Sequence, residues 1–270
     1  MFERKIMSLV AGLGALLVLA MLWDAFVKPP HRARSAAPPV VVDTARSAPV
    51  PAPPRPETTA TRAVENLQPV APNGPSYMEL LARSEIRRRI RASAGFTYLN
   101  DVVAESEDSA LHRWDNRINS PVRVYLATGT AANFQPEFLD AVRGAFQRWE
   151  DAGVPVRFDV SADSASAEVR FRWKVQFDIE RTGETHLTWD QGGHLLSGEV
   201  TLATFDPKGR PLGVDDVRVV ALHEIGHVIG LDHSPDSTDL MYATTKVRDL
   251  SSRDVQTARL LYQLAPGPLR

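Results

Sequence analysis

Three histidines and one glutamate gather in a short stretch near the C-terminal end of the chain: His223, Glu224, His227 and His233. Histidines four residues apart on a helix share one face, so the imidazoles of His223 and His227 can reach the same ion. Zinc binds imidazole nitrogen at roughly 2.0–2.1 Å, and three protein ligands leave a fourth position open for water or substrate. Glu224 points along a neighbouring face, towards such a water. The spacing therefore indicates a catalytic zinc site with its own general base.

Gly230 and His233 extend this motif. A glycine can take a positive φ and end a helix, so Gly230 is expected to let the chain turn and bring His233 back as the third ligand. The alternative is a core helix that carries histidines by chance. That interpretation is much less favoured, because a fixed glycine and a third histidine are two further requirements that a chance match must meet.

The composition is that of one ordinary domain with appendages. Of the 270 residues, 43% are hydrophobic and 24% are charged, and the formal net charge is −2. A balance so close to neutral gives no argument for a nucleic-acid partner. The sequence contains no cysteine, so a disulfide framework is excluded. The ligands of any zinc ion must then be histidine, aspartate or glutamate.

The N-terminal part of the sequence predicts a transmembrane segment. Residues 6–27 form an apolar run after Arg4 and Lys5, and about 20 apolar residues span a bilayer as a helix. The run is long and no clear small-residue cleavage site follows, which favours an uncleaved single-pass anchor over a signal peptide. We expect residues 1–5 in the cytoplasm and the body of the protein outside it, periplasmic or extracellular. If the segment is cleaved, the protein is secreted.

Two further segments separate this anchor from the catalytic domain. Residues 28–75 are rich in proline and alanine and poor in large apolar side chains, so they predict a linker without a core. Residues 76–117 predict an N-terminal extension that packs on the domain and begins with a helix capped by Ser76. The basic face of this helix could meet anionic lipid, although a solvated face is favoured. Residues 118–270 form the expected catalytic domain.

The expected catalytic domain mixes strands and helices. Period-two alternation predicts strands, and apolar residues spaced by three to four predict helices. The expected strands are residues 121–126, 156–160, 168–173, 185–189 and 199–203, and the expected helices are residues 135–150, 215–229 and 252–264. This order predicts an α+β fold with a mixed twisted sheet, an active-site helix and a C-terminal helix.

The residues after the motif carry a resemblance to a known family. Ser234 directly follows the third histidine, and Met241 lies in the run Asp239-Leu240-Met241-Tyr242. With the zinc motif, these residues resemble the metzincin metalloproteases, and more narrowly the matrixins. The resemblance covers the C-terminal part of the chain; the anchor, the linker and the extension lie outside it.

The resemblance implies a role for each residue of the motif. His223, His227 and His233 would bind one catalytic zinc ion, Glu224 would be the general base and later protonate the leaving amine, and Met241 would support the site without touching the metal. The fold implied is the metzincin-like zinc protease domain.

The chain also departs from the family. Matrixins commonly carry a second, structural zinc ion and calcium ions, but Ser197 stands where a histidine ligand would be expected. His186, Asp190 and His194 could still form an unorthodox site, although the pattern does not support a second zinc or calcium. The family's inhibitory cysteine cannot exist here. Ala243 replaces a frequent proline, which leaves the shape of the primary specificity pocket open.

Hypotheses from different classes follow from these patterns. The first is a zinc endopeptidase that hydrolyses extended protein or peptide segments, with Glu224 as general base and an edge strand that binds the substrate. Residues 195–203 are the expected edge. The second is a membrane-tethered zinc-fold binding or adaptor protein without protease activity. A zinc hydrolase for a non-peptide amide is a third. The intact Glu224 favours the first, because a non-catalytic site has no need of a base.

Overall fold

The structure is a computed structural model, and it describes residues 74–106 and 108–270. The expected anchor at residues 6–27 and nearly all of the expected linker lie outside the described residues. Within the described part, none of the helices combines the length and the apolar character that a membrane span requires.

The described chain contains five helices and seven strands. In chain order these are α2 (Tyr77–Ala92), α3 (Leu99–Glu105), β1 (Ala110–Leu111), β2 (Arg117–Leu126), α4 (Glu137–Asp151), β3 (Val156–Asp159), β4 (Val169–Lys174), β5 (Gly183–Trp189), β6 (Leu195–Ala203), α5 (Val214–Val228), α6 (Ser252–Gln263) and β7 (Gly267–Pro268). Every strand and helix expected for the catalytic domain is present, with ends that differ by a few residues.

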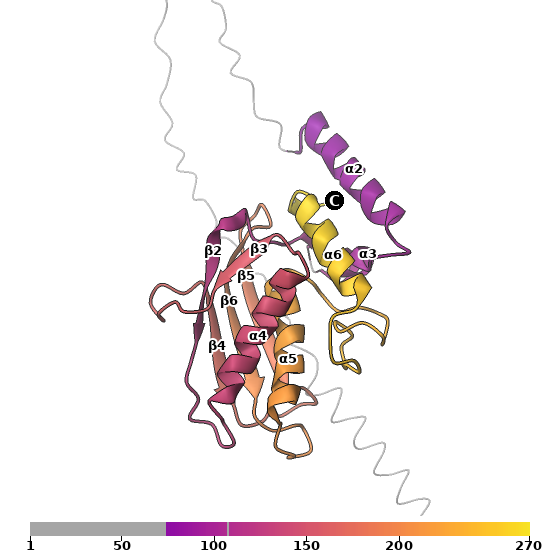
Figure 1. Cartoon of the computed structure of the whole chain (residues 1–270). Coiled ribbons are helices and arrows are strands. Elements are labelled where there is room, and N and C mark those ends of the chain that lie inside the picture. Colours follow the sequence, from indigo (N-terminus) through magenta and orange to yellow (C-terminus); the bar gives the residue numbers. More distant parts are fainter. Residues whose placement is uncertain (1–73, 107) are drawn as a thin grey trace, which may run out of the picture. The chain divides into compact units, whose positions relative to one another are not determined.

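A five-stranded mixed sheet carries the domain, and its strands lie in the order β3-β2-β4-β6-β5 (Figure 1). The strands β3, β2, β4 and β6 are parallel, whereas β5 runs antiparallel to β6. The expected α+β class with a mixed sheet is confirmed. The expectation that residues 195–203 form the edge is wrong, because β6 pairs with β4 on one side and with β5 on the other. The strand at this edge of the sheet is β5, and β3 forms the opposite edge.

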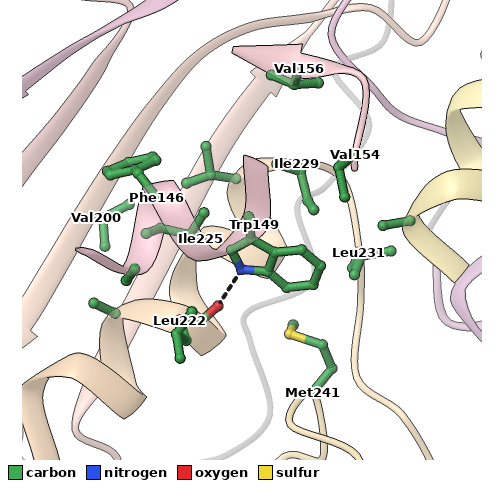
Figure 2. Packing of buried hydrophobic residues seen from close by; sticks show 14 of the residues in the cluster. Phe146, Trp149, Val154, Val156, Val200, Leu222, Ile225, Ile229, Leu231 and Met241 are labelled. Carbon is green, nitrogen blue, oxygen red and sulfur yellow. Dashed lines mark hydrogen bonds between the residues drawn. The ribbon is translucent and has the colours of Figure 1, made fainter. Parts of the chain in front are cut away.

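Helices α4 and α5 lie side by side against one face of the sheet (Figure 1). Phe146 of α4 contacts Phe158 of β3 and Phe171 of β4, with ring centroids 4.6 and 5.4 Å apart. The two helices are joined by the buried indole of Trp149, which donates a hydrogen bond to the main-chain oxygen of Leu222 over 2.9 Å (Figure 2). This packing fixes the position of α5, the helix that carries the zinc motif.

The N-terminal extension is fastened to the C-terminal helix. Ser76 caps α2 and exchanges hydrogen bonds with Glu79, as the sequence predicts. Tyr98, which is fully buried, donates its hydroxyl to Asp254 of α6 over 2.9 Å, and its N–H binds the hydroxyl of Thr257. The strand β1 pairs with β7 near the C-terminus. The extension is thus packed on the domain, as expected.

Candidate active site

The zinc-motif helix α5 ends where the sequence predicts. Gly230 has φ +97°, and the N–H of Leu231 reaches back to the oxygen of Gly226 over 3.0 Å. A Cβ at Gly230 would lie 2.1 Å from the main-chain oxygen of His112, so the position requires glycine both for its backbone conformation and for space. The chain reverses after this residue and returns to the helix with His233.

The three histidines of the motif come together. One candidate ligand atom from each of His223, His227 and His233 lies within 4.8 Å of the others. The Nδ1 of His223 is 2.9 Å from the oxygen of Leu240, and that of His227 is 2.9 Å from the oxygen of Leu231. These contacts favour a proton on each Nδ1, so each Nε2 keeps a free lone pair.

The inward-facing nitrogens fit a cation. The Nε2 atoms of His223 and His227 are 3.2 Å apart, and two lone pairs at that separation repel each other unless a positive ion lies between them. Burial lowers the pKa of both imidazoles to about 4, so both are neutral at pH 7, as metal ligands must be. Three imidazole nitrogens are the donor set that zinc takes in open sites, and here two of the three rings, those of His223 and His227, have their second nitrogen against a main-chain carbonyl.

Glu224 lies buried beside the histidines. Its Oε2 accepts a hydrogen bond of 2.6 Å from the hydroxyl of Thr185 in β5. A Cβ at Gly183 would lie 2.2 Å from Oε1, so the glycine leaves the space that the carboxyl group occupies. Burial raises the pKa of Glu224 above its ordinary value. Sequence reasoning missed Thr185 and Gly183, because only the packing of α5 on β5 brings them to the motif.

Met241 lies beneath the motif helix. A Cβ at Gly226 would lie 2.2 Å from the sulfur of Met241, so the thioether packs directly on the helix backbone. Leu240 and Met241 lie in a turn that the buried carboxylate of Asp254 holds in place. This carboxylate accepts hydrogen bonds from the N–H of Leu240 over 2.8 Å and from the N–H of Met241 over 3.3 Å. Because the oxygen of Leu240 in turn orients His223, this turn positions a candidate ligand. Sequence reasoning missed Asp254.

A cleft of about 1110 Å³ runs past the three histidines and Glu224 along the edge strand β5. The N–H of Ala203 bonds to the oxygen of Thr182 over 2.8 Å, which fixes the alternation of the antiparallel β5–β6 ladder. By that alternation, the main-chain N–H and C=O groups of Gly183, Thr185 and Leu187 point away from β6, towards the open edge. The cleft thus borders a strand with unpaired main-chain groups.

No second cluster of histidine and acidic side chains forms among the described residues. Across residues 74–106 and 108–270, the three motif histidines are the one group of candidate ligands close enough to hold an ion. His194 pairs with Asp190, with its Nδ1 3.3 Å from a carboxylate oxygen, and His186 pairs with Glu184, also at 3.3 Å. The unorthodox site that the sequence left open is therefore not formed by His186, Asp190 and His194.

A model of the matrixin family matches residues 113–263. The chain belongs to the matrixin family. This matrixin is 31% identical over 139 residues to Metalloendoproteinase 1-MMP of Arabidopsis thaliana. The matched region covers 47% of this chain and 37% of the relative. It is 27% identical over 157 residues to Metalloendoproteinase 1 of Glycine max, covering 49% and 50%.

A third relative is viral. The matrixin is 49% identical over 98 residues to the Probable matrix metalloproteinase 095L of Invertebrate iridescent virus 3, covering 34% of this chain and 27% of the relative. The chain thus spans half or less of the length of these relatives. Matrixins are zinc metalloproteases, and the triad of His223, His227 and His233 could hold a zinc ion.

Proposed function

We propose that this matrixin is a zinc-dependent endopeptidase in which Glu224 acts as the general base. The observation that carries the proposal is the meeting of three imidazoles and one buried carboxylate at the open edge of β5. A base, three ligands for a Lewis acid and an edge that can bind a peptide are what the hydrolysis of a peptide bond needs. A binding or adaptor protein needs neither the base nor its orientation by Thr185, so that alternative is not favoured.

The residues divide the chemistry among them. A zinc ion held by the three histidines supplies Lewis acidity, which polarises a carbonyl and lowers the pKa of a water molecule. Glu224 takes the proton of the attacking water on one carboxylate oxygen and delivers it to the amine that leaves. The hydroxyl of Thr185 holds the other oxygen at 2.6 Å and so fixes the direction in which the carboxylate faces. The buried surroundings strengthen these polar interactions.

The substrate is an extended protein or peptide segment that binds along β5. The free N–H and C=O groups of Gly183, Thr185 and Leu187 can pair with such a segment as a further strand of the sheet. A segment in that position passes directly over Glu224, because Gly183 and Thr185 both contact its carboxyl group. Folded substrates would have to open locally, because a strand can pair only when its own main-chain groups are free.

The proposed place of action is a membrane surface outside the cytoplasm. The apolar run at residues 6–27 supports an anchor, and the proline-rich residues 28–75 support a spacer between the anchor and the enzyme. The test is a reporter fused to the C-terminus in intact cells. Activity of a reporter that functions only after export supports the proposal, and activity of a reporter that functions only in the cytoplasm overturns it.

The variant Glu224→Ala tests the reaction. We expect it to keep bound zinc and its melting temperature and to lose about 10²–10⁴-fold in the cleavage rate, the usual contribution of a positioned base. Cleavage products of a proteome-derived peptide library, identified by mass spectrometry, provide the measurement and reveal the sequence preference. Glu85→Ala is the matched control, because Glu85 is exposed on α2. Undiminished cleavage by Glu224→Ala would exclude the assignment.

A further inference from the structure

We propose that the N-terminal extension forms one wall of the substrate cleft, and that the stacked rings of His112 and Trp189 select an apolar side chain of the substrate there. The inference rests on the proposed function, because it names a specificity site of the same cleft. The wall adjoins Gly230, three residues before His233, and residues His233, Val247 and Arg248 line the same cleft.

Four residues of the extension line the cleft together with the motif histidines; they are Val102, Ser106, Ala110 and His112. All four precede residue 113, where the match to the matrixin family begins. The cleft is therefore built partly by chain that the family match does not cover. Because this wall is continuous with the space around His227 and His233, a peptide long enough to leave the reaction centre on that side meets the extension.

The wall is a fixed part of the domain. The oxygen of His112 packs on Gly230, where a Cβ would lie 2.1 Å away, and the oxygen of Leu111 packs on Gly193, where a Cβ would lie 2.4 Å away. The buried indole of Trp114 donates to the oxygen of Val228 in α5 over 2.8 Å. The segment therefore presents the same surface to every substrate and cannot swing aside.

The rings of His112 and Trp189 form the recognition surface. Their centroids are 4.2 Å apart and their planes meet at 33°. The Nε2 of His112 is held 3.1 Å from a carboxylate oxygen of Asp108, and the side chain is only 15% exposed. Trp189 is 45% exposed, so the stack presents a supported indole to the cleft. A rigid, partly exposed aromatic surface of this kind binds aromatic or branched aliphatic side chains.

The position of the stack along β5 sets which substrate residue it meets. Thr185 lies beside Glu224, and Trp189 lies four positions further along the same strand. A strand rises about 3.3 Å per residue, so the selected side chain lies roughly two to four residues from the scissile bond. The preferred substrate class is thus an extended segment with an apolar residue at that distance, on the side that leaves past His233.

The experiment compares two long peptides that differ only at the selected position, with phenylalanine in one and serine in the other. We expect the wild type to prefer the phenylalanine peptide by about tenfold in kcat/KM, the value of one buried apolar contact. Trp189→Ala should abolish the preference. The ratio of kcat/KM for two peptides on one enzyme sample does not depend on the fraction that is folded. Leu196→Ala is the control, because Leu196 is an exposed apolar residue that does not line the cleft.

A second variant tests the wall itself. Ser106→Trp places a large ring on the lining of the cleft and should turn the preference towards the smaller serine peptide. Ser84→Trp, on the exposed face of α2, is its control and should keep the wild-type preference. A preference unchanged by both Trp189→Ala and Ser106→Trp would overturn the inference and leave the proposed function intact.

Binding separates the inference from the proposed function. The dissociation constants of both peptides can be measured by calorimetry on the Glu224→Ala protein, which needs no turnover. Tighter binding of the phenylalanine peptide, lost when Trp189→Ala is added, supports the inference even if the wild type cleaves neither peptide. Equal dissociation constants overturn it even if both peptides are cleaved.

Discussion

The hydroxyl of Thr185 donates a hydrogen bond of 2.6 Å to the Oε2 of Glu224, and this contact joins the edge strand β5 to the helix that carries the zinc motif. Oε1 of the same carboxyl group lies over Gly183. The strand proposed to bind the substrate therefore also orients the proposed base. The binding of the substrate and the orientation of the base thus depend on the same residues of β5, Gly183 and Thr185.

Replacement of Thr185 by valine should lower kcat by about tenfold or more and leave KM nearly unchanged. A hydrogen bond to a charged group contributes about 1.5–3 kcal/mol, and the loss of this one should lower kcat because it orients Glu224. KM should hardly change, because the main chain of β5 that pairs with the substrate is retained. Steady-state kinetics with one peptide provide the measurement. Thr185→Ser keeps the hydroxyl and should recover most of kcat. Equal kcat for the valine and serine variants would contradict the role of the hydroxyl.

Replacement of Gly183 by alanine should displace the carboxyl group of Glu224. The new Cβ would lie 2.2 Å from Oε1 and 2.7 Å from Cδ, and the flexible side chain can yield where the backbone cannot. A misplacement on the order of 1 Å can cost about 10²-fold in rate, so we expect a large loss of kcat with a small change in melting temperature. Gly144→Ala, on α4 with open space around it, is the control and should keep full activity.

Removal of zinc by a chelator should destabilise the protein. An ion that binds only the folded state at 1,000 times its dissociation constant adds about 4 kcal/mol to the free energy of unfolding. Thermal unfolding with chelator and after restoration of zinc provides the measurement, together with a zinc count of one per chain. His194→Ala should leave that count unchanged, whereas His227→Ala should abolish it. A melting temperature indifferent to chelator would contradict the metal centre.

The chelated protein should lose stability as the pH falls from about 6.5 to about 4. The pKa of His223 and of His227 drops from 6.5 to about 4 on folding because both rings are buried. Between these two pH values the unfolded chain binds more protons than the folded one. The contribution of the two neutral imidazoles to the free energy of unfolding is therefore fully present above pH 6.5 and is lost as the pH decreases. Urea unfolding at pH 7.5 and pH 5 provides the measurement.

The control for this pH dependence removes the titrating groups. The double variant His223→Asn, His227→Asn should show a shallower decline between pH 7.5 and pH 5 than the chelated wild type, since carboxylates then account for what remains. The same slope in both proteins would show that the two histidines do not contribute.

Local sequence patterns predicted the elements and brought together the candidate metal ligands because the interactions involved are short in sequence. His223 and His227 share a face by helical periodicity, Gly230 ends α5 through its own backbone conformation, and Ser76 caps α2 through a residue three positions away. Each of these follows from geometry within one or two turns of chain. The resemblance to matrixins, carried by the motif and Met241, is borne out by the family match at residues 113–263.

The order of the strands in the sheet could not be predicted from the sequence. Residues 183–189 and 195–203 form one antiparallel pair, and the alternation that predicts each strand does not say which of the two pairs with β4. The expected edge was consequently the wrong strand of the pair. The position of β5 at the edge matters for the site, because the free main-chain groups at the cleft belong to this strand and its residues also contact Glu224.

The sequence by itself determined which residues could bind a zinc ion and act as a base, because their spacing on one helix and its terminal turn already brings the ligands together. Only the tertiary structure decided what surrounds them. Thr185 reaches Glu224, Asp254 holds the turn of Met241, and His112 stacks on Trp189 through contacts between segments that are distant in the chain. Such contacts depend on the packing of the whole domain, and no local pattern records them.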